Sequence, residues 1–101
     1  MAEHASVIRV SHFEPSPGKR DDLKERLNEG LAELRASEGC FGAQICTVRE
    51  KPNEFAVVSR WASGAALDRY LQQRKANVAV LSDVLAQAPQ VEHFDAAEKP
   101  G

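Results

Sequence analysis

The alternation of apolar and polar side chains begins with a predicted β-strand over residues 7–13. This segment, Val-Ile-Arg-Val-Ser-His-Phe, is β-branched and aromatic. Two prolines and a glycine within Glu14–Gly18 end it, because they cannot continue a strand ladder. A helix is predicted next, since leucines recur at helical spacing at Leu23, Leu27, Leu31 and Leu34. Asp21 and Asp22 suit its positive end, and Gly39 suits its stop.

The middle of the chain predicts a β-hairpin. Residues 41–49 and 55–61 have the composition of two strands, and Lys51–Glu54 has that of the turn between them. Ser63 is a suitable N-cap for a second helix. The inward positions of that helix are Ala66, Leu67, Tyr70 and Leu71.

The last third of the chain predicts more helix and then a short strand. The helical stretch carries Val78, Leu81, Val84 and Leu85, Pro89 ends it, and residues 91–94 form the strand. The order is therefore β-α-β-β-α-β, the split pattern of a ferredoxin-like α+β fold. We expect one domain over residues 1–101, ordered over about 5–95, with an antiparallel sheet and helices on one face of it.

Both faces of the predicted sheet are apolar, although helices can cover only one. In the third strand Phe55, Val57 and Trp61 fall on one side, and Ala56 and Val58 fall on the other. A sheet with one wet face would alternate apolar with polar residues. A second copy of the same sheet is the simplest cover, so the sequence predicts a homodimer.

Composition and charge exclude several classes of function. The chain has 13 basic and 15 acidic residues, a net charge of −2, and no basic stripe of the kind that nucleic-acid-binding proteins carry. No apolar run is long enough to span a membrane, and residues 1–6 lack the features of a signal peptide. Two cysteines without a secretory signal are expected to be reduced thiols, and we expect a cytoplasmic protein.

No strong catalytic or metal-binding motif is present. Pro17-Gly18-Lys19 lacks the upstream glycine and the hydroxyl residue of a phosphate-binding loop. His4, His12 and His93 are too far apart to assemble a metal site, and Cys40 and Cys46 have no histidine at zinc spacing. The sequence therefore predicts no metal.

A set of polar residues at inward positions predicts a pocket. By strand parity Arg9, Ser11 and Phe13 share one face, and Ser59 and Trp61 share another with Phe55 and Val57. If both are the helix-facing side of one sheet, Ser11, Ser59 and Trp61 line the same space. Tyr70 and Asn77 are seven residues apart and could point into it together. The alternative is that Trp61 and Tyr70 are packing residues only.

Several segments, in order, give the chain its resemblance to a known family. They are Pro17-Gly18-Lys19, Glu38-Gly39-Cys40-Phe41-Gly42, Phe55-Ala56-Val57-Val58-Ser59-Arg60-Trp61, Ala62-Ser63-Gly64-Ala65-Ala66-Leu67 and Ala88-Pro89-Gln90-Val91. From about Val7 to Phe94 the sequence resembles the antibiotic biosynthesis monooxygenase superfamily of dimeric α+β barrels. The resemblance implies two ferredoxin-like protomers whose sheets pack across a two-fold axis, each with a pocket between its sheet and its helices.

The resemblance also implies a range of activities. Members of the superfamily include cofactor-free oxygenases of quinols and anthrones, haem-degrading enzymes and an isomerase of a signalling molecule. The haem-degrading members use an asparagine on the first strand, a tryptophan that ends the third, and a helical histidine. Trp61 matches this tryptophan, Ser11 stands in place of the asparagine, and Tyr70 and Asn77 replace the helical histidines.

The leading hypothesis is a cofactor-independent monooxygenase that acts on a small aromatic substrate of the quinol or anthrone type. Trp61, Ser11, Tyr70 and Asn77 are its candidate catalytic residues, and Phe13, Ser59 and Leu67 are its candidate substrate-binding residues. The alternative is a non-catalytic, stress-related or ligand-binding dimer with the same barrel. Haem degradation is the third hypothesis.

Overall fold

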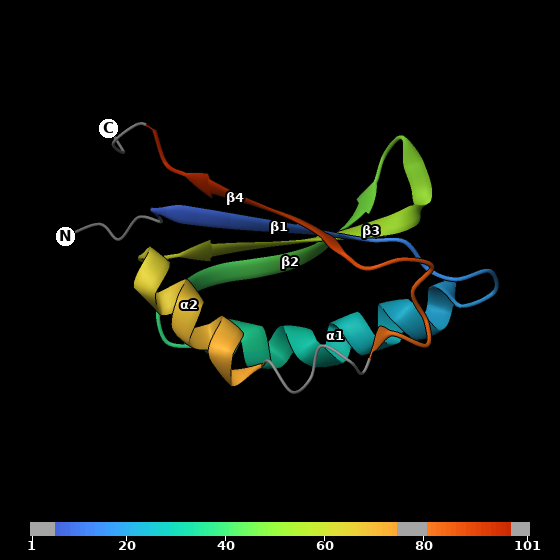
Figure 1. Cartoon of the computed structure of the whole chain (residues 1–101), viewed down its shortest axis with the longest axis horizontal. Helices are drawn as coiled ribbons and strands as arrows, with labels where there is room; N and C mark the ends of the chain where they lie inside the picture. The colour runs from blue at the N-terminus through green and yellow to red at the C-terminus, as the bar shows by residue number, and fades with distance from the viewer. Residues whose placement is uncertain (1–5, 75–80, 98–101) are drawn as a thin grey trace.

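The computed structural model describes residues 6–74 and 81–97, and its element order is the predicted β-α-β-β-α-β. The strands are β1 (Val7–Phe13), β2 (Cys40–Val48), β3 (Lys51–Trp61) and β4 (Gln90–Asp95), and the helices are α1 (Arg20–Ala36) and α2 (Gly64–Gln73). The strands form one antiparallel sheet in the order β2-β3-β1-β4, with both helices on the same face (Figure 1). The predicted α+β, ferredoxin-like fold is confirmed.

Helix α1 forms for the reasons its sequence gives. Its four spaced leucines, Leu23, Leu27, Leu31 and Leu34, are all buried against the sheet. Asp21 and Asp22 lie in the first turn, where the helix dipole favours negative charge. Helix α2 begins at the predicted cap, since the Ser63 hydroxyl accepts a hydrogen bond from the Ala66 amide at 3.1 Å.

The turn between α1 and β2 depends on Gly39. Its φ of +85° lies in the left-handed region, which residues other than glycine rarely adopt. A Cβ atom at this position would also come within 2.5 Å of the Cβ of Ala66 in α2. The Gly39 carbonyl accepts a hydrogen bond from the Ala62 amide at 2.8 Å, so this turn holds the segment that leads into α2.

The hairpin between β2 and β3 differs from the prediction. Lys51–Glu54 begins β3 instead of forming the turn, which lies at Arg49 and Glu50. Strand β1 pairs with β3 only as far as Phe55, so the start of β3 extends beyond β1. No backbone amide of β3 has to pair with β1 in this extension. Pro52, which lacks an amide hydrogen, is therefore acceptable in the strand. The hairpin tip projects past the rest of the sheet (Figure 1).

The predicted helical stretch over residues 78–85 is wrong in its described part. Residues 82–84 form a turn, with the Val84 amide bonded to the Leu81 carbonyl at 3.1 Å, and Leu85 pairs with Pro15 in an isolated bridge. Further hydrogen bonds to the loop after β1, from the Ser16 amide to Val84 and from the Ala86 amide to Glu14, satisfy this backbone without a helix. Val78 lies outside the described residues.

The helix-facing core consists of two clusters at opposite ends of the sheet. The first cluster contains Val7, Leu31, Leu34, Ala43, Trp61, Ala66 and Leu67, and the second contains Phe13, Leu23, Leu27, Phe55 and Val84. Partly buried Ile45 and Val57 pack against both clusters. Between the clusters, the central strands carry polar residues on the same face, and this is where the candidate site lies.

Candidate functional site

A cavity of about 380 Å³ lies between α1 and the centre of the sheet, in the size range of small-molecule sites. Its apolar walls come from both core clusters and from the turn before β4, and its polar groups come from β1, α1 and the end of α2. The described residues that line it are Arg9, Ser11, Phe13, Arg26, Leu27, Glu29, Gly30, Leu31, Glu33, Leu34, Val57, Tyr70, Arg74 and Leu81.

Strand β1 supplies the cavity floor through alternate residues. Arg9, Ser11 and Phe13 face the helices, and their register partners on β3 are Ser59, Val57 and Phe55. The predicted sharing of one face by these positions is confirmed, and Ser11 is only 1% exposed. The Arg9 guanidinium donates a hydrogen bond from Nη1 to the Ser11 hydroxyl at 2.7 Å, which turns the charged group along the strand toward Ser11.

Trp61 and Ser59 do not line the cavity but pack next to residues that do. Trp61 is fully buried, and its Nε1 donates a hydrogen bond to the Ser59 hydroxyl at 2.9 Å. The Trp61 ring lies 5.1 Å from the Tyr70 ring, centroid to centroid, at a tilt of 37°. This contact fixes the position of Tyr70, whose ring in turn has the Arg74 guanidinium 5.6 Å from its centroid.

The sequence-predicted residues therefore divide into three groups. Ser11, Phe13 and Tyr70 line the cavity, whereas Trp61, Ser59 and Leu67 are buried but are not among its lining residues. Asn77 lies outside the described residues, and α2 ends at Gln73.

Arg9 and Arg74 are lining residues that the sequence-based site did not include. Arg9 could have been recognised by parity, because it is a charged residue between Val7 and Ser11 on a face that is otherwise buried. Arg74 has no such signal, since its place depends on where α2 ends and how the helix lies over the sheet.

The cavity is positively polarised at Arg9. Burial lowers the pKa of Arg9 below its ordinary value, the nearby positive charge of Arg74 lowers that pKa further, and Tyr70 acts in the opposite direction. The side chain is half-buried and stays charged, because arginine does not deprotonate in proteins. Its Nε is buried and donates no hydrogen bond to any described residue.

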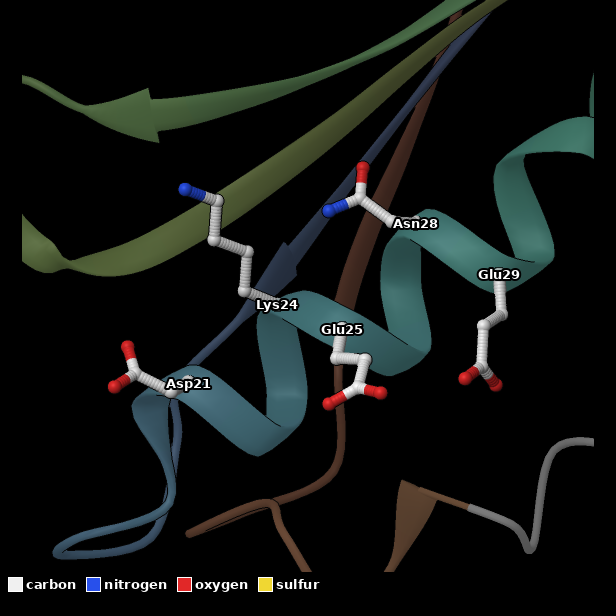
Figure 2. Close-up of a pocket in the computed structure, with 5 residues that line it drawn as sticks. All are labelled: Asp21, Lys24, Glu25, Asn28 and Glu29. Atoms are coloured by element: carbon white, nitrogen blue, oxygen red, sulfur yellow. The ribbon is translucent and has the colours of Figure 1, made fainter.

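A second depression, of about 510 Å³, lies on the outer side of α1 (Figure 2). Its lining residues, Asp21, Lys24, Glu25, Asn28 and Glu29, are all exposed and come from this one helix. In Figure 2 their side chains project away from the helix in different directions and meet at no common point. Although it is larger, this depression has no enclosed apolar wall, so the cavity beneath α1 is the candidate site.

A comparison with protein-family models decides the family. The model of the antibiotic biosynthesis monooxygenase domain matches residues 6–98. The chain belongs to this family. The resemblance read from its sequence segments is thereby confirmed, and a comparison with curated proteins gave no match.

Solved structures of similar proteins show the same fold. Rv0793 from Mycobacterium tuberculosis superposes with a TM-score of 0.84 at 20% identity, covering 96% of this chain and 100% of that one. Two proteins provisionally named as antibiotic biosynthesis monooxygenases are also similar. The one from Deinococcus radiodurans has a TM-score of 0.82 at 16% identity (94% and 96% covered), and the one from Caulobacter crescentus has 0.81 at 22% (95% and 93%).

Three further observations concern the described residues of this antibiotic biosynthesis monooxygenase domain. Among residues 6–74 and 81–97, no three histidine, cysteine or acidic side chains come together in a group that could hold a metal ion. Neither described helix is long and apolar enough to cross a membrane. Cys40 and Cys46 form no disulfide with each other.

Proposed function

We propose that this protein is a cofactor-independent monooxygenase of a small aromatic substrate of the quinol or anthrone type. The observation that carries the proposal is the cavity between α1 and the sheet, with apolar walls and a few convergent polar groups. Membership of the antibiotic biosynthesis monooxygenase family supports the same class of reaction. Apolar enclosure with sparse polar groups is the usual construction of a site for a small, mostly apolar ligand.

The reaction places a modest demand on the protein. In an anthrone, the ring CH₂ group loses two hydrogens, one atom of O₂ becomes the new carbonyl oxygen, and the other leaves as water. The ionised substrate supplies the electrons, so the protein must bind it, favour its anion and exclude bulk water. The positive potential at Arg9 favours the ionised form of a hydroxyl bound next to it.

We assign the residue roles from their positions. Ser11 and Tyr70 hydrogen-bond the substrate oxygens, and Phe13 forms part of the apolar wall. Trp61 and Ser59 hold Tyr70 in place through the ring contact and the indole hydrogen bond, and Leu67 packs in the same cluster as Trp61. Asn77 stays in the proposal as a further candidate on the segment after α2.

The test is oxygen uptake by the metal-stripped protein with a panel of hydroquinones and an anthrone. Tyr70→Phe keeps the ring that packs on Trp61 and removes one hydroxyl, so uptake should fall at least tenfold without loss of fold. Arg69→Gln, on the same helix at an exposed ion pair with Glu38, is the matched control and should keep full uptake. Uptake at the autoxidation rate, or equal rates in both variants, contradicts the proposal.

A specific observation favours a second candidate, a non-catalytic ligand-binding protein. Among the described residues that line the cavity there is no histidine, and the carboxylates of Glu29 and Glu33 are exposed on α1. Histidine is the usual general base near neutral pH. Thermal stabilisation by a hydroquinone without any oxygen uptake would favour this candidate.

We further propose that the protein is a cytoplasmic homodimer, as proteins of this family are typically dimeric. The sheet face opposite the helices supports the dimer, because register places Ile8, Val10, Val58 and Phe94 on it. Phe94 is 46% exposed there. Light scattering at micromolar concentration should give twice the 11.1 kDa chain mass, and a monodisperse monomer would contradict the dimer.

A further inference from the structure

Arg9 and Arg74 reach the same cavity from different elements, β1 and the residue that caps α2. The two positive charges repel each other, and Arg74 and Tyr70 are the groups whose charge acts on Arg9 among the described residues. Neither arginine forms an ion pair within residues 6–74 and 81–97. Two like charges brought together beside an apolar wall cost free energy unless an opposite charge offsets them.

The other charged groups around the cavity do not offset these two. Arg26 is paired with Asp83, at 2.7 and 3.0 Å. Glu29 and Glu33 line the cavity from α1, but both are exposed and neither comes within ion-pair distance of Arg9 or Arg74. On β4, the register partner of Arg9 is His93, which brings no negative charge.

The donors of the two arginines are also available. Arg9 uses Nη1 on Ser11, whereas its buried Nε has no acceptor among the described residues. The Arg74 guanidinium carbon lies 5.6 Å from the centroid of the Tyr70 ring, and no side-chain hydrogen bond joins Arg74 to another described residue. Guanidinium edges match a carboxylate in geometry as well as in charge.

From this arrangement we propose that the cavity binds an aromatic carboxylate, with Arg9 and Arg74 as the residues that hold its anionic group. The ring packs between Phe13, Leu27 and Val57, and the carboxylate lies on the Tyr70 side. This inference rests on the proposed function in using the same cavity, and it narrows the substrate class to aromatic acids. It concerns binding, so it can be tested without turnover.

The experiment compares 1-hydroxy-2-naphthoate with 1-hydroxy-2-naphthamide by isothermal titration calorimetry. The two probes have nearly the same shape and differ in charge. The wild-type protein should bind the carboxylate at least tenfold more tightly than the amide, and this ratio should fall as salt is raised. Equal affinities, or no measurable binding of either probe, overturn the inference.

Three variants locate the preference. Arg9→Gln and Arg74→Gln should each reduce the carboxylate-to-amide ratio toward one, and Arg74, at a helix end, can be replaced even if Arg9→Gln fails to fold. Arg69→Gln, an arginine on the same helix outside the cavity, should keep the ratio. A ratio that survives both cavity variants overturns the assignment.

Oxygen uptake, measured separately with a neutral hydroquinone and with a hydroquinone that carries a carboxylate, distinguishes this inference from the proposed function. If the protein prefers the carboxylate probe but shows no oxygen uptake, the anion site is supported and the proposed oxygenase activity is contradicted. If the protein takes up oxygen but binds the two probes equally, the proposed oxygenase activity is supported and the anion site is contradicted.

Discussion

The two faces of the single sheet bury their side chains in different ways. On the helix-facing side, α1 and α2 cover the strands so completely that Ser11 and Ser59 are 1% and 2% exposed. On the opposite side no described element covers the strands, yet apolar residues such as Val10, Val58 and Phe94 lie there beside polar ones such as Arg60 and Gln44. The protomer thus buries a few polar groups under its own helices, and it leaves apolar side chains on a face for which it supplies no cover.

This difference separates the face that carries the proposed ligand site from the face that carries the proposed dimer contact. Hydroxyls and an arginine are tolerable in the covered layer because they bond to each other, as Ser11 does with Arg9 and Ser59 with Trp61. On the uncovered face, the apolar side chains are stabilised only when their area is removed from water. Substitutions on the first face should change folding or ligand binding, and substitutions on the second should change association.

The largest expected effect comes from the covered face, with Trp61→Ala. Removal of a fully buried indole leaves a cavity in the core and takes away the support of Tyr70, so we expect a loss of about 3–5 kcal/mol in the free energy of unfolding. Chemical denaturation measures it. A loss below about 1 kcal/mol would mean that Trp61 packs less tightly than its burial indicates.

On the uncovered face, Val58→Asp should separate the protomers of the proposed homodimer without unfolding them. Val58 faces Val10 across the β1–β3 ladder, so a carboxylate there would be buried without a partner in a sheet-to-sheet contact. We expect the apparent mass to halve by light scattering while the circular dichroism spectrum stays the same. Lys51→Asp, at the exposed hairpin, is the control. An unchanged mass would place the dimer contact elsewhere.

A smaller effect is expected for Ser59→Ala, which leaves the shape of the covered face nearly intact. The buried Nε1 of Trp61 would lose its acceptor, so the free energy of unfolding should fall by about 1–3 kcal/mol. Ser59→Thr keeps a hydroxyl and should recover part of the loss. No change in Ser59→Ala would show that another acceptor replaces the hydroxyl.

The smallest effect is expected for Asp83→Asn, at the turn that closes the cavity near Leu81. The hydrogen bonds from Arg26 lower the pKa of Asp83 below its ordinary value of 3.8. Folding thus stabilises the ionised form, and this contribution is complete above about pH 3.8 and is lost as the pH falls through the lower folded-state pKa. The variant should melt slightly below the wild type at pH 7, and the two should converge toward pH 2. A difference that is the same at both pH values would contradict the role of charge.

Sequence patterns predicted most of the fold because they report which side of an element is buried. The four leucines of α1 and the alternation of Arg9, Ser11 and Phe13 depend only on helical and strand periods, and both were correct. The start of β3 was missed because Pro52 is acceptable only where β1 has already ended. Residues 81–85 were missed because their backbone bonds go to the loop after β1, a long-range contact.

The candidate site was less predictable for the same reason. Strand parity brought Ser11 and Phe13 to the helix-facing side, and helical spacing added Tyr70. Arg74 required knowing that α2 ends at Gln73, and the separation of Trp61 from the cavity required knowing that Tyr70 lies against its ring. Periodicity gives the face on which a residue lies, whereas a cavity depends on how two elements fit together.

The turn at Gly39 therefore has an influence beyond its own neighbourhood. Gly39 does not line the cavity, and neither of its neighbours in the chain does. It nevertheless determines how closely α2 approaches the strands, because only a hydrogen atom fits between the Gly39 backbone and Ala66. A methyl group at Gly39 would act as a wedge under the first turn of α2 and would tilt Tyr70 and Arg74 relative to Arg9. A substitution at Gly39 should therefore change which ligands fit the cavity, although Gly39 itself does not line it.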